Sequence, residues 1–569
     1  MNKQAILHIP MSQYAYGLDD RHIVFRLRSA AGDLLQCRLI YGDRSCRRTP
    51  VDYYAAEMPV IASDTLFDWR EVTLETSFTR ICYAFELVDK EGNLEYYYGD
   101  LFHAGLTDDR SAYFQLPFNH RADRLNIPDW MQDAIVYNIF PDSFASGRRT
   151  ISGKAEDLLF QGKHVRGKLG GTVRGATANL DYLKDLGVNC IYFNPIFAAG
   201  EYHKYDLIDY YHIDPVFGTD DEFRLLVQKA HSLGIRVMID GVFNHCGWHF
   251  FAFEDVVRNG KASPYWNWFY DLQEPVIIPD DMADYPNYAC FGYERMMPKL
   301  ACDHPAVIEY FCQVGSWWVS RFDIDGWRLD VASEVNDAFW RAFRKAVKAV
   351  KPDCALIGEV WESAGHWLDG SMFDSTMNYD FRKHAAAFFA GDNADAKAFN
   401  HRVTDMLMRY RRPVTYAELN LLDSHDVSRF LSLCGNDLRK MKLAVLFQMT
   451  FVGMPCIFYG DELGMTGFSE EEYRHPMEWE NTSHPLHEFY RKSIALRKRY
   501  PALRRGAFAQ EASDDYVFRY SRILDEEKIT VILNRSDTVV SFMPCKEFLW
   551  KSGEQNAILE PYGFVVMKG

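Results

Sequence analysis

Polar side chains and one tryptophan collect at the ends of several short apolar segments of this sequence. In chain order these residues are Asp240, Asn244, His245, Arg328, Asp330, Glu334, Glu359, Trp361, His425 and Asp426. A single Asp after an apolar segment is usually a helix cap or half of an ion pair. Several acids that converge on one place repel one another, a cost that a fold avoids unless a site uses them. The pattern therefore predicts a functional carboxylate cluster.

Two kinds of chemistry suit such a cluster: binding of a divalent metal ion, and acid–base or covalent reaction at a glycosidic bond. Arg328 stands two residues before Asp330, so in a strand both side chains lie on one face. The fixed charge of the guanidinium favours an ionised carboxylate, which suits a nucleophile. Flat aromatic faces that can stack on sugar rings occur in the connecting segments, at Tyr205, Trp248, Phe291 and Trp361. No Walker loop occurs, so nucleotide chemistry has no support.

Eight apolar segments of strand length alternate with amphipathic helices from about Asp129 onward, a pattern typical of a parallel sheet. The predicted strands begin at Ala134, Asn189, Arg236, Gly326, Ala355, Ser375, Ala417 and Pro455. Helices are predicted at 177–186, 220–233, 305–322, 337–350 and 437–447. Eight strand–helix units predict an α/β fold, the (β/α)8 TIM barrel, with its active site at the C-terminal ends of the strands.

Three further regions flank or interrupt the predicted barrel. Short alternating segments with turns predict an N-terminal β-sandwich at 1–122, ahead of a catalytic barrel at 123–502. Strand-like runs return at 503–569 and predict a C-terminal antiparallel β domain. The connection after the third strand, 245–300, is rich in Trp, Tyr, Pro and Asp, and its length indicates a small excursion domain over the barrel mouth.

Charge and composition narrow the class of partner. The 569 residues include 63 basic and 79 acidic ones, a net charge of −16 that opposes binding to nucleic acid or to an anionic membrane. The apolar run 443–460 is interrupted by Gln, Gly and Pro, which favours a buried helix and strand over a membrane span. The first 20 residues lack the apolar core of a secretory signal, and the 12 cysteines lack metal-binding or C-x-x-C spacing. A cytoplasmic protein is expected.

Four motifs carry a resemblance to a known family. DGVFNH (240–245), GWRLDVASEV (326–335), GEVW (358–361) and LLDSHD (421–426) resemble, in this order, the conserved regions of the α-amylase family of glycoside hydrolases. HKYD (203–206), DPVFG (214–218), MPKL (297–300) and YGDELGM (459–465) resemble its neopullulanase, cyclomaltodextrinase and maltogenic amylase branch. The resemblance is strong from about residue 129 to residue 480.

The resemblance implies a role for each site residue. Asp330 matches the nucleophile, Glu359 the general acid/base, and Asp426 the carboxylate that stabilises the transition state. The residues expected to bind substrate are Tyr205, Asp240, His245, Phe291, Arg328, Glu334, Trp361, His425, Asp461 and Arg474. Among these, Trp361 matches the aromatic residue that guides the acceptor sugar, and Asp461 and Arg474 match contacts on the non-reducing side.

The implied activity is retaining hydrolysis of α-1,4-glucosidic bonds, with α-1,6 bonds as a further target and some transglycosylation. The implied substrates are cyclodextrins, maltooligosaccharides, pullulan and starch, and the implied assembly is a homodimer. Two alternatives stay open. One is an α-1,6-glucosidase or a transglycosylating synthase on the same barrel, which MPKL and the N-terminal β domain argue against. The other is a non-catalytic sugar-binding relative, which the retained acids argue against.

The chain departs from its family at several positions. Ser146, Arg148, Arg149 and Thr172 stand where relatives often carry Asn or Asp ligands for calcium, and they make poor ligands. We therefore expect that this Ca²⁺ site is lost, that the protein has no other metal site, and that no cofactor is required. Ser333, Asp423 and Ala301 replace a usual asparagine, glycine and asparagine. These changes are expected to alter specificity rather than catalysis.

Overall fold

The structure is a computed structural model that describes residues 1–279, 284–391, 394–511, 513–544, 546–553 and 557–569. The chain forms two compact units. One comprises Met1–Asn126, Asp392–Thr415 and Gly506–Gly569, and the other comprises Ile127–Gly391 and Tyr416–Arg505. The predicted barrel domain, 123–502, includes the segment Asp392–Thr415 of the first unit. Helix α9 (Ala396–Met408) of this segment packs against strands of the first unit, with Phe399 and Phe518 in edge-to-face contact at 4.9 Å.

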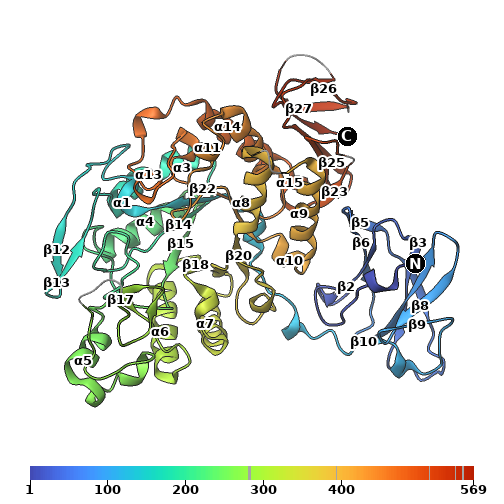
Figure 1. Ribbon diagram of the computed structural model, residues 1–569, viewed down its shortest axis with the longest axis horizontal. Helices are drawn as coiled ribbons and strands as arrows, with labels where there is room; N and C mark the ends of the chain where they lie inside the picture. The colour runs from blue at the N-terminus through green and yellow to red at the C-terminus, as the bar shows by residue number, and fades with distance from the viewer. Residues whose placement is uncertain (280–283, 392–393, 512, 545, 554–556) are drawn as a thin grey trace. The chain divides into compact units, whose positions relative to one another are not determined.

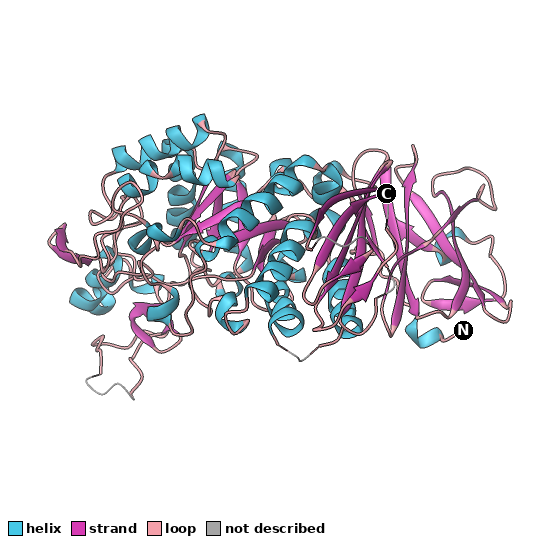
Figure 2. Cartoon of the chain, turned by 90° about the horizontal axis from the view of Figure 1, so that it is seen from above, coloured by secondary structure: helices cyan, strands magenta, loops and turns pink. Residues whose placement is uncertain are grey.

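The second unit is a closed barrel of eight parallel strands, which confirms the predicted fold. The strands are β11 (Val136–Ile139), β14 (Cys190–Phe193), β15 (Arg236–Gly241), β18 (Gly326–Leu329), β19 (Ala355–Gly358), β20 (Ser375–Asn378), β21 (Leu419–Leu421) and β22 (Met454–Phe458). Figure 1 shows strands at the centre of this unit with α3, α4, α6, α7 and α8 outside them. In Figure 2 helices lie on both sides of the barrel strands.

The barrel helices follow from local sequence signals. They are α1 (Pro141–Phe144), α2 (Val173–Ala178), α3 (Leu180–Leu186), α4 (Asp220–Ser232), α6 (Pro305–Phe322), α7 (Asp337–Val350), α8 (Tyr379–Ala385), α11 (Phe430–Leu433), α12 (Leu438–Thr450), α13 (Glu470–Tyr473), α14 (Pro485–Arg499) and α15 (Pro501–Arg505). A capping box between Thr219 and Glu222 starts α4, and Gly187 in the left-handed region ends α3. The bounds of α6 and α7 match the sequence prediction.

Apolar side chains fill the barrel interior. Residues from neighbouring strands form one buried cluster, including Val136, Cys190, Met238, Ile357, Met377, Leu419 and Cys456. Strands with both faces buried need apolar residues at successive positions, which explains the continuous hydrophobic runs in the sequence. Buried polar side chains lie near the C-terminal ends of the strands, such as Asp240 in β15 and Arg328 in β18.

Two connections at the barrel mouth have structure of their own. The excursion after β15 contains α5 (Phe251–Asn259) and a hairpin of β16 (Cys290–Phe291) and β17 (Glu294–Pro298). It returns to its origin through a bridge between His245 and Lys299, while 280–283 lie outside the described residues. The hairpin of β12 (Asp157–Phe160) and β13 (Lys163–Arg166) was missed in the sequence analysis. Its turn residues, Gln161 and Gly162, both have positive φ, and the Gly was the available signal.

The first unit contains the N-terminal sandwich and the C-terminal sheets. One sandwich sheet is β1 (Ala15–Gly17), β2 (His22–Ala30), β6 (Phe67–Glu75) and β5 (Val60–Ser63). The other is β4 (Tyr54–Glu57), β3 (Leu34–Asp43), β7 (Ile81–Asp89), β8 (Leu94–Tyr98) and β9 (Leu101–His103), with β10 (Phe114–Leu116) beside β7. Phe25, Leu39 and Phe85 are in the buried cluster of this sandwich.

The C-terminal part is antiparallel, as predicted. Its main sheet is β23 (Ala507–Gln510), β24 (Val517–Leu524), β25 (Glu527–Asn534), β29 (Phe564–Lys568) and β27 (Glu547–Lys551), beside a small pair of β26 (Val540–Ser541) and β28 (Ile558–Leu559). Across all the residues described above, no helix is both long enough and apolar enough to cross a membrane.

Candidate active site

A pocket of about 670 Å³ opens at the C-terminal ends of the barrel strands. The predicted site residues that line it are Tyr205, His245, Phe291, Asp330, Glu334, Glu359, Trp361, Asp426 and Arg474. Asp330 follows β18, Glu359 follows β19, and Asp426 follows β21. The barrel therefore brings together three carboxyl groups from distant parts of the chain, as the sequence predicted.

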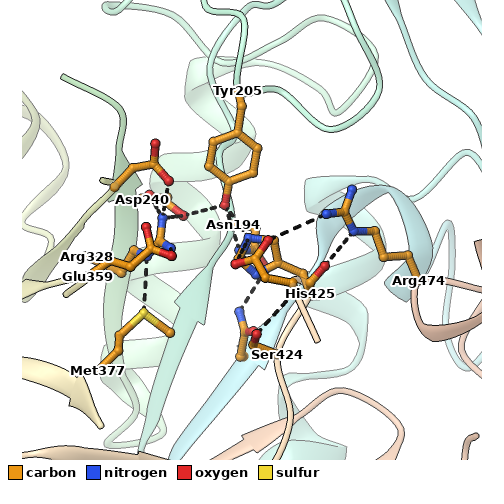
Figure 3. A network of polar contacts seen from close by, with 12 residues as sticks. Asn194, Tyr205, Asp240, Arg328, Glu359, Met377, Ser424, His425 and Arg474 are labelled. Atoms are coloured by element: carbon orange, nitrogen blue, oxygen red, sulfur yellow. Dashed lines mark hydrogen bonds and ion pairs between the residues drawn. The ribbon is translucent and has the colours of Figure 1, made fainter. Parts of the chain in front are cut away.

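Arg328 lies beneath the pocket and contacts three carboxyl groups. Its Nη1 donates to Asp330 Oδ1 at 2.7 Å and to both oxygens of Asp240 at 3.0 Å. Its Nη2 forms an ion pair with Glu359 Oε1 at 2.8 Å. Figure 3 shows the guanidinium between Asp240 and Glu359. Since the Arg328 side chain is fully buried, its single charge is shared among acids that water does not screen.

The charges around Asp330 act in opposite directions. Burial raises the pKa of Asp330 well above its usual range, Glu359 and Asp240 add to this effect, and Arg328 opposes it. Of these effects, the one predicted from the sequence is that of Arg328, which stands two residues before Asp330. With three acids around one cation, the cluster favours a state in which one proton is retained, because full ionisation would leave uncompensated negative charge. A retained proton is what general acid catalysis requires.

His425 and Tyr205 form one wall of this buried cluster. The two rings are nearly parallel, at 7° and 5.6 Å, and Tyr205 Oη lies 2.6 Å from His425 Nε2. Tyr205 donates to Asp240 Oδ2 at 3.0 Å, and Asn194 Nδ2 lies 2.9 Å from His425 Nδ1. Burial lowers the pKa of His425 well below its usual range. The imidazole is therefore neutral and serves as a hydrogen-bonding group rather than as a cation.

Asp426 faces the pocket from the turn after β21. Its carboxylate lies 3.1 Å from His425 Nε2 and 3.6 Å from Arg474 Nη2. Arg474 also donates from Nε to the His425 carbonyl at 2.8 Å, which ties the guanidinium to the same turn. Burial raises the pKa of Asp426 to about 7, with Glu359 adding to the effect and Arg328 opposing it.

Aromatic residues line the side of the pocket near Glu359. Trp361 is half exposed, donates from its indole to Glu359 Oε1 at 3.2 Å, and stacks on Tyr379 at 3.8 Å and 11°. Phe291, from the excursion hairpin, stacks on His245 at 4.8 Å. Burial lowers the pKa of His245 to about 3, so this imidazole is also neutral.

Two polar residues of the loop after β18 lie at the same pocket. Glu334 is held by an ion pair with Lys299 at 2.8 Å, which places its carboxylate at the rim. Ser333, one of the departures from the family, also lines the pocket. Because Ser333 departs from the family and lines the pocket, we expect it to alter which substrates this site accepts compared with its relatives.

Asp461 is not among the residues that line the pocket, and its contact with substrate stays a prediction. It is 2% exposed, and its Oδ1 accepts from the buried Arg429 at 2.8 Å. Glu470 lines the pocket instead, beside Arg474, and accepts from the Tyr202 hydroxyl at 2.7 Å. The four-residue spacing of Glu470 and Arg474 on a short helix was the signal that the sequence offered.

His203 is a second pocket residue that sequence reasoning missed. Burial lowers the pKa of His203 to about 4, so it is neutral beside the pocket. It stands two residues before Tyr205 in the HKYD motif, and that proximity was the available signal.

Hydrogen bonds within the protein hold the loop after β11. Asn179 uses both ends of its amide there: Oδ1 accepts from the Arg149 amide at 2.9 Å, and Nδ2 donates to the Gly147 carbonyl at 2.9 Å. The Thr172 hydroxyl accepts from the Gly175 amide as the N-cap of α2. Within the described ranges, no group of three His, Cys, Asp or Glu side chains is arranged to hold a metal. The side-chain oxygens of Asn179 and Thr172 thus both accept backbone N–H groups of this region.

Comparisons with known proteins agree with this geometry. The family model "Alpha amylase, catalytic domain" matches residues 138–485, and "Alpha amylase, N-terminal ig-like domain" matches residues 1–120. A cyclomaltodextrinase of Geobacillus thermopakistaniensis (strain MAS1) is 40% identical, over 100% of this chain and 99% of its own length. Neopullulanase 2 of Thermoactinomyces vulgaris is 38% identical over the same shares of the two chains. A solved cyclomaltodextrinase structure superimposes with a TM-score of 0.89 at 35% identity, covering 100% of this chain and 98% of that one. The chain belongs to the α-amylase family of glycoside hydrolases.

Proposed function

We propose that this enzyme hydrolyses α-1,4-glucosidic bonds in cyclodextrins and short maltooligosaccharides with retention of anomeric configuration. Pullulan and starch are further substrates, and α-1,6 bonds are a second target. The observation that carries the proposal is the contact of Arg328 with Asp330 and Glu359 beneath a pocket that Asp426 also faces. The similarity to a cyclomaltodextrinase and a neopullulanase supports the choice of substrate.

In the proposed first step Asp330 attacks the anomeric carbon while Glu359 protonates the departing glycosidic oxygen. The C–O bond to the leaving sugar breaks, and an ester forms between the sugar and Asp330. Asp426 stabilises the positive charge that develops on the sugar ring, and the neutral His245 and His425 hydrogen-bond to hydroxyls. Tyr205 and Arg328 hold the groups around Asp330 in place.

In the second step Glu359 removes a proton from water, which attacks the anomeric carbon and releases Asp330. A sugar hydroxyl that replaces this water gives transglycosylation. Trp361 supports this competition because its half-exposed indole lies beside Glu359, where an acceptor sugar can stack. No organic or redox cofactor takes part in either step.

The test of this function compares initial rates on β-cyclodextrin and soluble starch under matched conditions, with chelator present and products separated by chromatography. Faster ring opening to maltose and glucose is the expected result. Faster starch cleavage would contradict the proposed preference. Activity confined to α-1,6 bonds would establish an α-1,6-glucosidase. Products that are mainly larger than the substrate would establish a transglycosylating synthase. Binding of the sugar without turnover would establish a non-catalytic relative.

We further propose that activity is independent of calcium and that the enzyme works in the cytoplasm. The hydrogen bonds of Asn179 support the first point, because they hold the loop without a cation. The second is supported by the cysteines, since all those in the described residues are free and most are buried. Fractionation of the source cells with an activity assay tests the location, and activity in the culture medium would contradict it.

We also propose a homodimer in which the N-terminal domain of each protomer covers the active site of its partner. The resemblance to the cyclomaltodextrinase branch supports this assembly. The exposed apolar residues Tyr54, Leu94 and Leu101 of the N-terminal sheets provide surface that a partner can cover. No nucleic acid or membrane partner is proposed.

A further inference from the structure

Lys204 is a buried lysine that precedes Tyr205 in the chain. It is 0% exposed, although lysine is rarely buried completely unless it is paired. It is not among the residues that line the pocket, whereas its neighbours His203 and Tyr205 both are. Its φ of 66° lies in the left-handed region, which is uncommon for residues other than glycine. A buried charge and an unusual backbone conformation thus occur together at the residue next to Tyr205.

Three acceptors surround the Lys204 ammonium group. Nζ forms an ion pair with Asp214 Oδ2 at 2.7 Å and donates to the carbonyl oxygen of Arg166 at 2.7 Å. The third acceptor is the carbonyl oxygen of Ala199, at 3.4 Å. An ammonium group has three donors, so each of them has an acceptor. The side chain therefore connects the end of β13, the loop that carries Tyr205 and the loop that contains Asp214.

Asp214 is itself held in place by backbone amides. Its Oδ2 accepts from the Ala199 amide at 3.0 Å, and its Oδ1 accepts from the Val216 amide at 2.9 Å. Asp214 is also 0% exposed, so water does not screen its ion pair with Lys204. Removal of either partner would leave a buried charge uncompensated. Asp214 therefore holds the Lys204 side chain in one position.

The loop that carries Lys204 is closed at its base by a bridge between Ala199 and Leu207. Within the loop, the Tyr205 amide donates to His203 Nδ1 at 3.1 Å. The bridge fixes the two ends of the loop, and the Lys204 side chain fixes the part between them. The direction in which the Tyr205 side chain leaves the loop thus depends on Lys204.

The Tyr205 hydroxyl contacts two groups of the buried cluster. It donates to Asp240 Oδ2 at 3.0 Å and lies 2.6 Å from His425 Nε2, and Figure 3 shows it pointing toward both. Asp240 also accepts from Arg328, which donates to Asp330 as well. A shift of the Tyr205 ring would therefore disturb the groups that hold the proposed nucleophile.

We propose that Lys204 is a positioning residue, which holds the backbone before Tyr205 in its left-handed conformation and so places the Tyr205 hydroxyl among the groups around the nucleophile. The inference rests on the proposed function, which gives those groups their roles. A left-handed backbone at a residue other than glycine persists only where the surrounding contacts hold it. Without the ammonium group the loop relaxes, and the Tyr205 ring moves with it.

The test is a double-mutant cycle between Lys204→Met and Tyr205→Phe, with kcat and KM measured on β-cyclodextrin. Methionine has no charge and no donor, so we expect kcat to fall about 10- to 100-fold while KM changes less than about threefold, because the disturbed groups act mainly in the transition state. Tyr205→Phe alone keeps the ring and should lower kcat to a similar extent. In that background Lys204→Met should lower kcat less than about threefold more. A purely structural role would lower kcat equally in both backgrounds.

Asp214→Asn is a milder second variant for the same cycle. It keeps the shape of the Asp214 side chain but removes its charge. We expect kcat to fall about three- to tenfold in the parent and to stay unchanged in the Tyr205→Phe background.

Lys351→Met is the matched control. Lys351 also pairs with two carboxylates, Asp323 at 2.8 Å and Asp325 at 3.0 Å, and donates to two carbonyl groups. It lies before β19, at the opposite end of the barrel from the pocket. Its replacement should lower thermal stability without changing kcat per folded molecule. Circular dichroism reports the folded fraction of every variant.

Three outcomes would overturn the proposal. The first is folded Lys204→Met with kcat within about threefold of the parent, and the second is folded Tyr205→Phe with the kcat of the parent. The third is a fall in kcat as large in the Tyr205→Phe background as in the parent, and Asp214→Asn decides this point if Lys204→Met does not fold.

Asp330→Asn separates the two levels of inference. If Asp330→Asn is inactive and the cycle shows no coupling between Lys204 and Tyr205, only the positioning role fails. If Asp330→Asn is normal, the proposed function itself fails.

Discussion

The three acids that line the pocket have different proposed roles in the reaction: Asp330 is the nucleophile, Glu359 the general acid and base, and Asp426 the group that stabilises the transition state. Asp330→Asn removes the nucleophile, Glu359→Gln removes the group that transfers the proton, and Asp426→Asn removes the charge that stabilises the transition state. We expect each substitution to lower kcat/KM on β-cyclodextrin at least about 10³-fold, equal to about 4 kcal/mol of barrier. The exposed Glu362→Gln, three residues beyond Glu359, is the control and should behave as the parent. Near-normal turnover by purified Asp330→Asn would refute the assignment.

The ionisation of Asp426 sets a pH dependence. Burial raises the pKa of Asp426 to about 7, so its carboxyl group is mainly protonated below that pH and mainly ionised above it. The ionised form stabilises the positive charge that develops on the sugar ring, so kcat/KM should rise as the pH rises through about 7. The measurement is a kcat/KM profile with the enzyme's stability checked at each pH. A profile that stays flat between about pH 6 and pH 9 would contradict this view of the site.

At the scale of elements, the sequence was informative where local signals and tertiary structure agree. The eight strands, α6 and α7 were predictable because their apolar periodicity and capping residues mark both type and bounds. The catalytic carboxylates were predictable because they follow those strands. The ion pair of Asp461 was not predictable, because its partner Arg429 lies 32 residues earlier and is brought to it only by the fold. Glu470 was missed because its four-residue spacing from Arg474 indicates a helical pair but not that this pair faces the pocket.

The loop after β11 gives a prediction at this scale. Asn179 is 1% exposed and bonds to Gly147, Arg149 and Gly175, so Asn179→Ala removes three hydrogen bonds that hold the loop and leaves the buried Gly175 carbonyl without this donor. We expect a loss of about 2–4 kcal/mol in unfolding free energy, seen as a thermal midpoint several degrees lower. Asn259→Ala, at an exposed helix end, is the control.

The same loop predicts how calcium affects stability. A bound ion would stabilise the folded state in proportion to its occupancy, whereas protein hydrogen bonds do not depend on it. Neither chelator nor added calcium should therefore change the thermal midpoint or the rate on β-cyclodextrin. A clear drop of the midpoint in chelator would show that the loop does bind the ion.

At the scale of the whole molecule, the family assignment covers the barrel and the N-terminal domain, and assembly is the property left to test. Light scattering at micromolar concentration should give about twice the 66.1 kDa of one chain. Changing the exposed Tyr54 to Lys should weaken association if this face is covered, since a buried unpaired charge is costly. A monomer at that concentration would refute the dimer.

The most direct measurement is covalent trapping with a 5-fluoro glycosyl fluoride, which forms the glycosyl–enzyme ester faster than the ester is hydrolysed. Peptide mass spectrometry then locates the added sugar. We expect the label on Asp330, and accumulation of more label when Glu359 is replaced by alanine, because the second step lacks its base. Label on any other residue, or a first product of inverted anomeric configuration, would contradict the double-displacement mechanism and the site on which it rests.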